Sequence, residues 1–243
     1  MKQILIYLLF LYLPVTCFAQ NKTEDPIFYI NTPLHPPTAT TKHDGFEDLL
    51  AIELFNRLGF KKITIHNVPA ERGLINLNNG IDDAILTRVA GLEAIYPNIV
   101  RITEPANVRK YTAFTRTPER IKTWDDLANY DVAYITGWKI FDKNVKKYRS
   151  LIKVRGPEQL FTLLEKKRVE VVLYAHEAGN YLVKKLKLTD IKPLEEPLAN
   201  KQKYFYLHKR HAQLVPKANA VLRQLKKDGI YDELKRQTLQ SHQ

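Results

Sequence analysis

The stretch AERGLINLNNGIDDAILTRVAGLE, residues 70–93, decides the fold of this protein. Its first nine residues predict a short amphipathic helix that Asn79 and Gly80 end. The apolar run at residues 83–87 predicts a buried strand, and Arg88 follows it directly. A helix, a turn and a buried strand in this order are typical of α/β proteins with parallel sheets.

The same alternation continues on both sides of this stretch. Before it, we expect strands at residues 27–31 and 62–68 and an amphipathic helix at 46–58. After it, strands are expected at 100–103 and 111–116, and a helix begins near Thr123 or Asp125. A second strand-and-helix series occupies residues 132–185, and a strand at 204–207 precedes a long amphipathic C-terminal helix.

The first 19 residues have the pattern of a secretory signal peptide with cleavage after Ala19. Lys2 provides a positive start, and the apolar run at residues 4–15 is too short to span a membrane comfortably. We therefore predict an exported protein that is located in the periplasm. The only cysteine, Cys17, falls in this segment, which excludes disulfides, cysteine catalysis and cysteine–zinc sites from the mature chain.

The chain is basic, with 38 Lys and Arg against 26 Asp and Glu, and a formal net charge of +12. This charge fits a solvated basic surface, or attraction to anionic ligands or an anionic membrane face. The sequence contains no nucleic-acid-binding motif. Its seven histidines are scattered without metal-ligand spacing. We expect no metal and no cofactor.

The repeated pattern predicts two α/β lobes joined by a two-strand hinge. The predicted divisions are a signal peptide at 1–19, the first part of lobe 1 at 20–115, lobe 2 at 116–203, and a return strand with C-terminal helices on lobe 1 at 204–243. Each lobe is expected to hold a mainly parallel sheet flanked by helices. The cleft between two hinged lobes is the natural place for a ligand.

Several short strings occur in an order that resembles the periplasmic solute-binding proteins of family 3, the polar amino acid-binding type. They are Gly45-Phe46 with an acidic helix start, LNNGIDDA at 77–84, WDDL at 124–127, VAYITG at 132–137, LEKKRVE at 164–170 and LKKDGIY at 225–231. The resemblance covers essentially the whole mature chain. It implies a two-lobe clamp of the type II periplasmic binding protein kind.

The resemblance also implies a function. Most proteins of this family close on a small solute and deliver it to an ABC-type permease in the inner membrane, and they are usually monomers. Strand ends and helix N-termini hold the carboxylate of the ligand, because helix N-termini present unpaired N–H groups.

Three positions depart from the pattern of that family. The arginine that usually follows the first-lobe Asp by about a dozen residues is absent there, and Arg88 comes early instead. Gly137 is followed by Trp138 and Lys139 rather than by two threonines, and Ala175 stands where an aspartate usually holds the ligand's ammonium. The usual α-amino clamp is therefore not visible.

Seven residues are candidates for ligand contact. Arg88 suits a carboxylate or phosphate at a strand end, or else forms a surface ion pair with Glu93 or Glu71. The others are Arg72 and Lys139 as cations, Trp138 and Tyr174 as aromatic surfaces, Glu93 as an acceptor for a cationic group, and His35 in the first cleft loop; His176 is a weaker candidate.

The leading hypothesis is a solute-binding protein, not an enzyme, for a small polar, anionic or zwitterionic, amino acid-like solute. One alternative is a sensing or partner-binding periplasmic protein, which would use the same lobe surfaces as a transport protein. A less favoured alternative is a dehydratase on the same fold, with Glu93 or Glu177 as a buried acid that transfers a proton.

Overall fold

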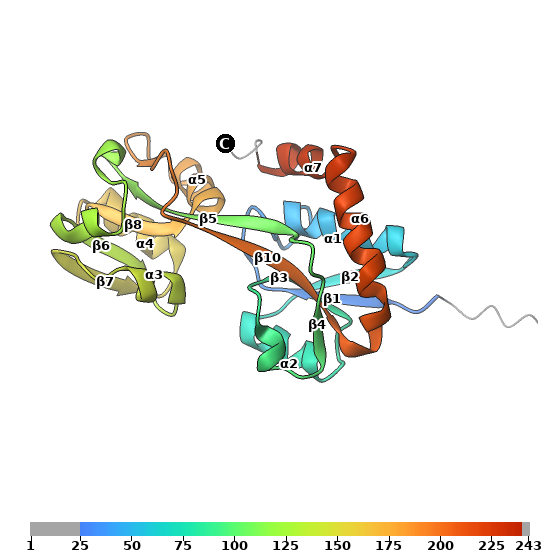
Figure 1. The fold of residues 1–243 in the computed structure, drawn as a ribbon. Coiled ribbons are helices and arrows are strands. Elements are labelled where there is room, and N and C mark those ends of the chain that lie inside the picture. Colours follow the sequence, from blue (N-terminus) through green and yellow to red (C-terminus); the bar gives the residue numbers. More distant parts are fainter. Residues whose placement is uncertain (1–24, 240–243) are drawn as a thin grey trace, which may run out of the picture.

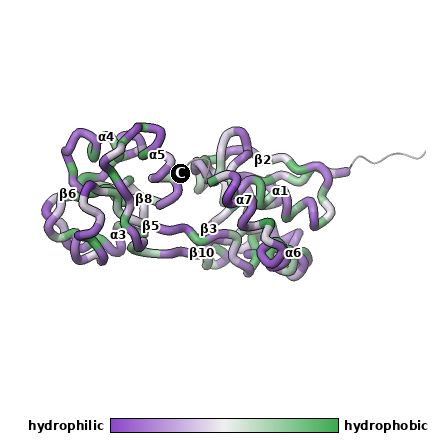
Figure 2. The backbone as a smooth tube through the Cα atoms, turned by 90° about the horizontal axis from the view of Figure 1, so that it is seen from above, coloured by the Kyte–Doolittle hydropathy of each residue, from purple (hydrophilic) through white to green (hydrophobic). Residues whose placement is uncertain are grey.

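Two lobes, each built around its own β-sheet, make up residues 25–239, the part of the chain that this computed structural model describes (Figure 1). Two long antiparallel strands, β5 (Asn107–Thr115) and β10 (Ala199–His208), run side by side between the lobes (Figure 1, Figure 2). Because both strands enter both lobes, the sheet is continuous, in the order β2-β1-β3-β10-β5-β8-β6-β7. The predicted two-lobe α/β clamp is confirmed.

Lobe 1 is a mainly parallel sheet between two layers of helices. Strand β1 (Phe28–Thr32) lies parallel to β2 (Ile63–Asn67) and β3 (Ala84–Arg88), and β10 runs antiparallel to β3 and β4 (Ile99–Arg101). One face packs against α1 (Phe46–Leu58), α6 (Val215–Lys227) and α7 (Ile230–Leu239). The other face packs against α2 (Ala70–Asn78) and the 3₁₀-helix η1 (Leu92–Ala94).

Lobe 2 repeats this arrangement. Strand β6 (Asp131–Ile135) lies parallel to β7 (Ser150–Val154) and β8 (Val171–Ala175), while β5 runs antiparallel to β8 and β9 (Lys192–Pro193). Helices α4 (Pro157–Glu165) and α5 (His176–Lys185) cover one face. The other face holds α3 (Lys139–Asn144) and the segment with the 3₁₀-helices η2 (Pro118–Arg120) and η3 (Asp125–Asn129). A further 3₁₀-helix, η4 (Lys209–Leu214), follows β10.

Three sequence predictions differ from the structure in detail. The helix expected after Thr123 is the short η3, and the carboxylate of Asp126, not Thr123 or Asp125, accepts the backbone N–H groups before it. The long C-terminal helix is two helices, because Gly229 adopts a φ of +78° between them. Both connecting strands begin earlier than expected, because their first residues are mostly polar and lack the apolar pattern of a buried strand. The predicted boundary between residues 203 and 204 therefore falls inside β10.

The predicted signal peptide lies outside the described residues. None of the helices between residues 25 and 239 is long and apolar enough to cross a membrane.

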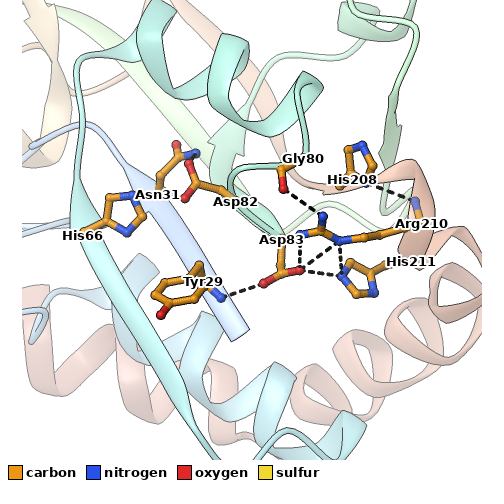
Figure 3. Close-up of polar contacts among 9 residues, drawn as sticks. All are labelled: Tyr29, Asn31, His66, Gly80, Asp82, Asp83, His208, Arg210 and His211. Atoms are coloured by element: carbon orange, nitrogen blue, oxygen red, sulfur yellow. Dashed lines mark hydrogen bonds and ion pairs between the residues drawn. The ribbon is translucent and has the colours of Figure 1, made fainter. Parts of the chain in front are cut away.

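Asp83, at the start of β3, joins three segments of lobe 1 (Figure 3). Its Oδ1 accepts hydrogen bonds from Arg210 Nη2 (2.6 Å) and His211 Nε2 (2.7 Å), and its Oδ2 accepts the Tyr29 amide (2.8 Å). Burial raises the pKa of Asp83, but the hydrogen bonds from His211, Tyr29 and Arg210 outweigh it and lower the pKa to about 2. This carboxylate thus ties η4 to β1 and β3.

The neighbouring Asp82 contacts β1 and β2 through Asn31 and His66 (Figure 3). Its Oδ2 accepts from Asn31 Nδ2 (2.6 Å), and its Oδ1 lies 3.1 Å from His66 Nε2. Asn31 Nδ2 also donates to the carbonyl of Gly73 in α2 (3.1 Å). A Cβ atom at Gly73 would lie 2.4 Å from Asn31 Oδ1, so this close approach requires glycine.

We predict that Asp83→Asn lowers the free energy of unfolding by on the order of 2 kcal/mol at pH 7. The folded pKa is depressed, so the stabilisation is present above the unfolded value of 3.8 and is lost as the pH falls towards 2. Urea denaturation of both proteins should therefore give unfolding free energies that converge between these pH values. The exposed Asp125→Asn is the control, and a gap of unchanged size at low pH would contradict the assignment.

Candidate functional site

The carboxyl ends of the parallel strands in the two lobes face each other across the connecting strands. Strand β3 ends at Arg88, which pairs with Tyr204, and the preceding residues of β10 pair with β5 on the way to lobe 2. Strand β8 ends at Ala175, which pairs with Tyr111, where β5 arrives from lobe 1. We call residues 107–111 and 199–203 the connecting ribbon. Ligands in open α/β sheets bind at such strand ends.

Glu47 is the central anion of this region. It lies in the first turn of α1 and is 2% exposed. Its Oε1 accepts from Asn107 Nδ2 (3.1 Å) and Arg109 Nη2 (3.0 Å), and its Oε2 accepts from Thr87 Oγ1 (2.6 Å). We call these four residues the Glu47 network. Both oxygens of the carboxylate are engaged, by β3 and by the ribbon.

Arg88 has hydrogen-bond donors that the protein does not use. Its Nη1 donates to the carbonyl of Thr87 (2.9 Å), but its Nε and Nη2 are buried without a partner in the described part of the chain. Burial, together with the positive charge of Arg109, lowers the pKa of Arg88 to about 10, while Glu47 acts in the opposite direction. Unpaired buried donors are rare in native proteins and require an explanation.

Lys203 adds a third cation at the end of the connecting ribbon. It is 7% exposed, and its backbone pairs with Asn107. Burial and the charge of Arg109 lower the pKa of Lys203 to about 7, against the opposing effect of Glu47. We call Arg88, Arg109 and Lys203 the cationic cluster. Glu47 is the acidic group that opposes it, so the region carries excess positive charge.

The Pro-rich loop after β1 brings His35 to this cluster. Its amide donates to the carbonyl of Ala39 (2.9 Å), and the Glu47 amide donates to the carbonyl of Thr38 (2.7 Å), which holds the loop on the start of α1. A Cβ atom at Gly45 would lie 2.5 Å from Thr38 O, so glycine is needed here. Burial lowers the pKa of His35 well below 6.5, and the positive charge of Arg109 adds to this effect. The imidazole is therefore neutral, and its buried Nε2 has no partner within residues 25–239.

Aromatic rings from lobe 2 complete the site. Gly137 adopts a φ of +84° after β6 and turns the chain so that Trp138 lies over the strand ends. The Trp138 ring stacks on Tyr174 (centroids 4.8 Å apart) and meets the edge of Tyr111 (6.0 Å). We call these three residues the aromatic wall. Trp138 also reaches His35 of lobe 1, with ring centroids 6.3 Å apart, so the two lobes approach each other here.

Four of the seven predicted residues lie around this region, namely Arg88, His35, Trp138 and Tyr174. The alternative for Arg88, a surface ion pair with Glu93 or Glu71, is not found among residues 25–239. Glu93 instead pairs with Arg101 (3.4 Å) and accepts from Tyr206 (3.3 Å), and Glu71 accepts from Tyr96 (2.5 Å).

The other three candidates are not brought into the cluster by any contact within residues 25–239. Arg72 is exposed in the first turn of α2, Lys139 is exposed at the start of α3, and Glu93 is held by the pair just described. Their contact with a ligand stays a prediction.

The sequence reasoning missed Glu47, Arg109, Lys203 and Tyr111. A signal was present: both connecting strands carry cations within otherwise strand-like segments, NVRKYTAFT and ANKQKYFYLH. A strand that crosses between lobes has one end exposed to the cleft, so its cations can serve a ligand there.

A cavity of about 540 Å³ lies between α5 and α7 and shares no lining residue with the cationic cluster. His176, Glu177 and Lys110 line it on one side, and Asp232 and Lys235 line it on the other. Burial lowers the pKa of His176. The weaker candidate His176 and the candidate acid Glu177 therefore lie beside the cationic cluster rather than in it.

Comparison with known proteins supports this description of the fold. No family model matches the chain. An uncharacterized protein of Shewanella oneidensis is 25% identical over 234 residues, which cover 92% of this chain and 85% of that protein.

Solved structures match over most of both chains. The GluR0 ligand-binding core in complex with L-glutamate has a TM-score of 0.76 at 16% identity, over 89% of this chain and 99% of that one. The chain has the fold of the type II periplasmic binding proteins. An ancestral cationic amino acid solute-binding protein has a TM-score of 0.72 at 19% identity, over 88% of this chain and 95% of that one. A histidine kinase sensor domain with similarity to periplasmic binding proteins has a TM-score of 0.68 at 17% identity, over 88% of this chain and 96% of that one.

These matches confirm, at the level of the fold, the resemblance to polar amino acid-binding proteins. At such identities the likeness concerns the fold, so the chemistry of the cleft must be argued from its own residues.

We predict that Lys203→Met stabilises the free protein by about 1–3 kcal/mol at pH 6. The folded pKa of Lys203 lies below its unfolded value of 10.5, so the penalty is fully present below pH 7 and is relieved as the pH rises towards 10.5. Chemical denaturation should therefore show a gain that is largest at pH 6 and shrinks at pH 9. The exposed Lys201→Met should change stability little at either pH, and a loss of stability in Lys203→Met would contradict the prediction.

Proposed function

We propose that this protein is a periplasmic solute-binding protein that captures a small anionic or zwitterionic solute between its two lobes. The observation that carries the proposal is Arg88, whose buried Nε and Nη2 have no hydrogen-bond partner within residues 25–239 and lie beside two further cations. A guanidinium with two free donors can bind a carboxylate or phosphate through both. The location in the periplasm rests on the predicted signal peptide.

Each lobe supplies a different part of the proposed site. Lobe 1 supplies Arg88 and His35, the connecting ribbon supplies Arg109 and Lys203, and lobe 2 supplies the aromatic wall. A solute that contacts both lobes stabilises the closed arrangement by its differential affinity for that state. Binding and closure are then one equilibrium.

Two uses of such binding fit the fold. We favour delivery to an ABC-type permease, since most proteins that the sequence resembles work in this way. Sensing is the second candidate, because a histidine kinase sensor domain has the same fold. We propose no catalytic role, because Glu93 is ion-paired with Arg101 and Glu177 lines the separate cavity.

We predict that Arg88→Met weakens binding by on the order of 2 kcal/mol, or roughly 30-fold, because a desolvated charged hydrogen bond is lost. The ligand is first found with a melting-shift panel of amino acids, dicarboxylates, phosphorylated compounds, small peptides and sugars. Its dissociation constant is then measured by calorimetry for each variant.

Arg57→Met is the matched control for this measurement. Arg57 lies in the last turn of α1 and forms an exposed ion pair with Glu53, so its loss should leave affinity unchanged. Equal affinity of Arg88→Met and the wild type would remove Arg88 from the site.

We also predict that the affinity for an anion falls above about pH 7. Lys203 is faced by Arg109, Glu47 and Arg88, and the loop of His35 adds no charge, so the free Lys203 loses its proton near pH 7. A bound anion raises this pKa, so binding takes up a proton above pH 7. Affinity then falls by at most about tenfold for each pH unit above 7.

Calorimetry from pH 6 to pH 9, in two buffers of different ionisation enthalpy, measures both the affinity and the proton uptake. In Lys203→Met the affinity should be lower at pH 6 and nearly constant with pH. A wild-type affinity that does not change across this range would count against a role for Lys203.

A further inference from the structure

We infer that the cleft selects a dianion without an ammonium group, such as a dicarboxylate or a phosphoryl compound, over an α-amino acid. The inference rests on the proposed function, because it concerns the ligand of the same cleft. It follows from the balance of hydrogen-bond donors, acceptors and charges around the cationic cluster.

Two cationic side chains in this region have donors without partners. Arg88 presents Nε and Nη2, both buried and unpaired within the described residues. Lys203, 7% exposed, has an ammonium with three donors and no ion pair among residues 25–239. His35 presents a neutral Nε2 that is buried and unpaired in the same part of the chain. A ligand that satisfies these groups must bring several acceptors.

Among the described residues, two carboxylates lie at the start of α1 in this region, and neither offers a free, fully charged oxygen to an ammonium at pH 6. Both oxygens of Glu47 are occupied by Thr87, Asn107 and Arg109. Asp48 Oδ2 accepts the amides of Thr40 and Gly45, which fold the loop that carries His35, and Asp48 Oδ1 is buried without a partner within residues 25–239. Burial raises the pKa of Asp48 to about 7, so this carboxyl group is mostly protonated at pH 6 and offers an ammonium no full negative charge.

On the lobe 2 side, the end of β8 and the tyrosines of the aromatic wall provide no anion for an ammonium within residues 25–239. Strand β8 ends in Ala175, which is 1% exposed, and the hydroxyl groups of Tyr174 and Tyr111 are neutral. Burial raises the pKa of Tyr174 to about 12, so no tyrosinate forms there at neutral pH. An ammonium in this cleft would lose its hydration shell without a compensating charge.

The charges lead to the same class of ligand. Within residues 25–239, Glu47 is the acidic group whose charge acts on Arg88 and Lys203, so a cluster with Lys203 protonated carries two positive charges in excess. A dianion neutralises this excess, whereas a zwitterion brings one further positive charge. The aromatic wall offers ring faces on which the apolar middle of a small ligand can pack.

Matched pairs of probes test the inference, because the members of a pair differ chiefly in the ammonium group. The mature protein is titrated calorimetrically at pH 6 with succinate and aspartate, and with glutarate and glutamate. Inorganic phosphate and glycerol phosphate, titrated at pH 7 where a large share of each is dianionic, test the phosphoryl source of the same chemistry. Each titration is repeated with Arg88→Met, with Lys203→Met and with the exposed Lys201→Met as control.

We expect at least one dicarboxylate to bind about tenfold or more tightly than its amino acid partner. Binding should weaken roughly 30-fold in Arg88→Met, weaken also in Lys203→Met, and stay unchanged in Lys201→Met. Binding of a phosphoryl probe alone, with the same dependence on the variants, supports the dianion and identifies its source as phosphoryl.

Two results would overturn the inference, and they are distinguishable. If an amino acid binds as tightly as its dicarboxylate partner and depends on Arg88, the inference fails while the proposed function stands. If no probe binds up to about 10 mM, both the inference and the anion-binding function fail.

Discussion

The hydrogen bonds to the Glu47 carboxylate are the constraint on which the rest of the cleft depends. They join the start of α1 to the end of β3 through Thr87, and to the connecting ribbon through Asn107 and Arg109. The position suits an anion, because the first turn of a helix carries partial positive charge and unpaired N–H groups. A buried carboxylate is tolerated only when it is paired in this way. Without it, the cationic cluster would lack its buried counter-charge.

In the proposed function, this arrangement lowers the stability of the free protein and keeps the cationic cluster ready to bind an anion. Burial lowers the pKa of both Arg88 and Lys203, which means that the free protein holds these cations at a cost in folding free energy. Lobe 1 has compensating interactions away from the cleft. Asp83 with Arg210 and His211, and Asp82 with Asn31, hold the opposite end of the sheet (Figure 3). The stabilising and the binding groups thus lie at opposite ends of β3.

The fold was predictable because it rests on local periodicity. The alternation of strands and amphipathic helices, with Gly59 and Gly80 as stops, identifies the α/β lobes along the chain. The sequence did not predict the polar first halves of β5 and β10. Most residues there are exposed or half-buried, so no regular pattern of apolar residues marks these halves as strands. Arg109 and Lys203 lie in these halves.

The residues of the site were only partly predictable from the sequence. The end of a predicted strand indicates where a side chain lies, but it does not indicate which other side chains it contacts. Arg88, Trp138 and Tyr174 follow from their places after predicted strands. The role of Glu47 does not, since an acidic residue in a first helical turn is common and its three partners come from residues 40 to 62 positions away. Only the folded chain shows that the expected partners of Arg88 are engaged elsewhere.

In the proposed function, the position of the cations on the ribbon would couple ligand binding to movement of the lobes. Arg109 and Lys203 lie on the two strands that connect the lobes, so any change in lobe angle acts on the segment that holds them. Trp138 of lobe 2 reaches His35 of lobe 1, so approach of the lobes also brings the aromatic wall over the cluster. Closure removes water from these charges, and electrostatic attraction strengthens in the drier surroundings. An anion that bridges Arg88 to the ribbon therefore gains most of its interaction energy in the closed state, which is the condition for a ligand to drive closure.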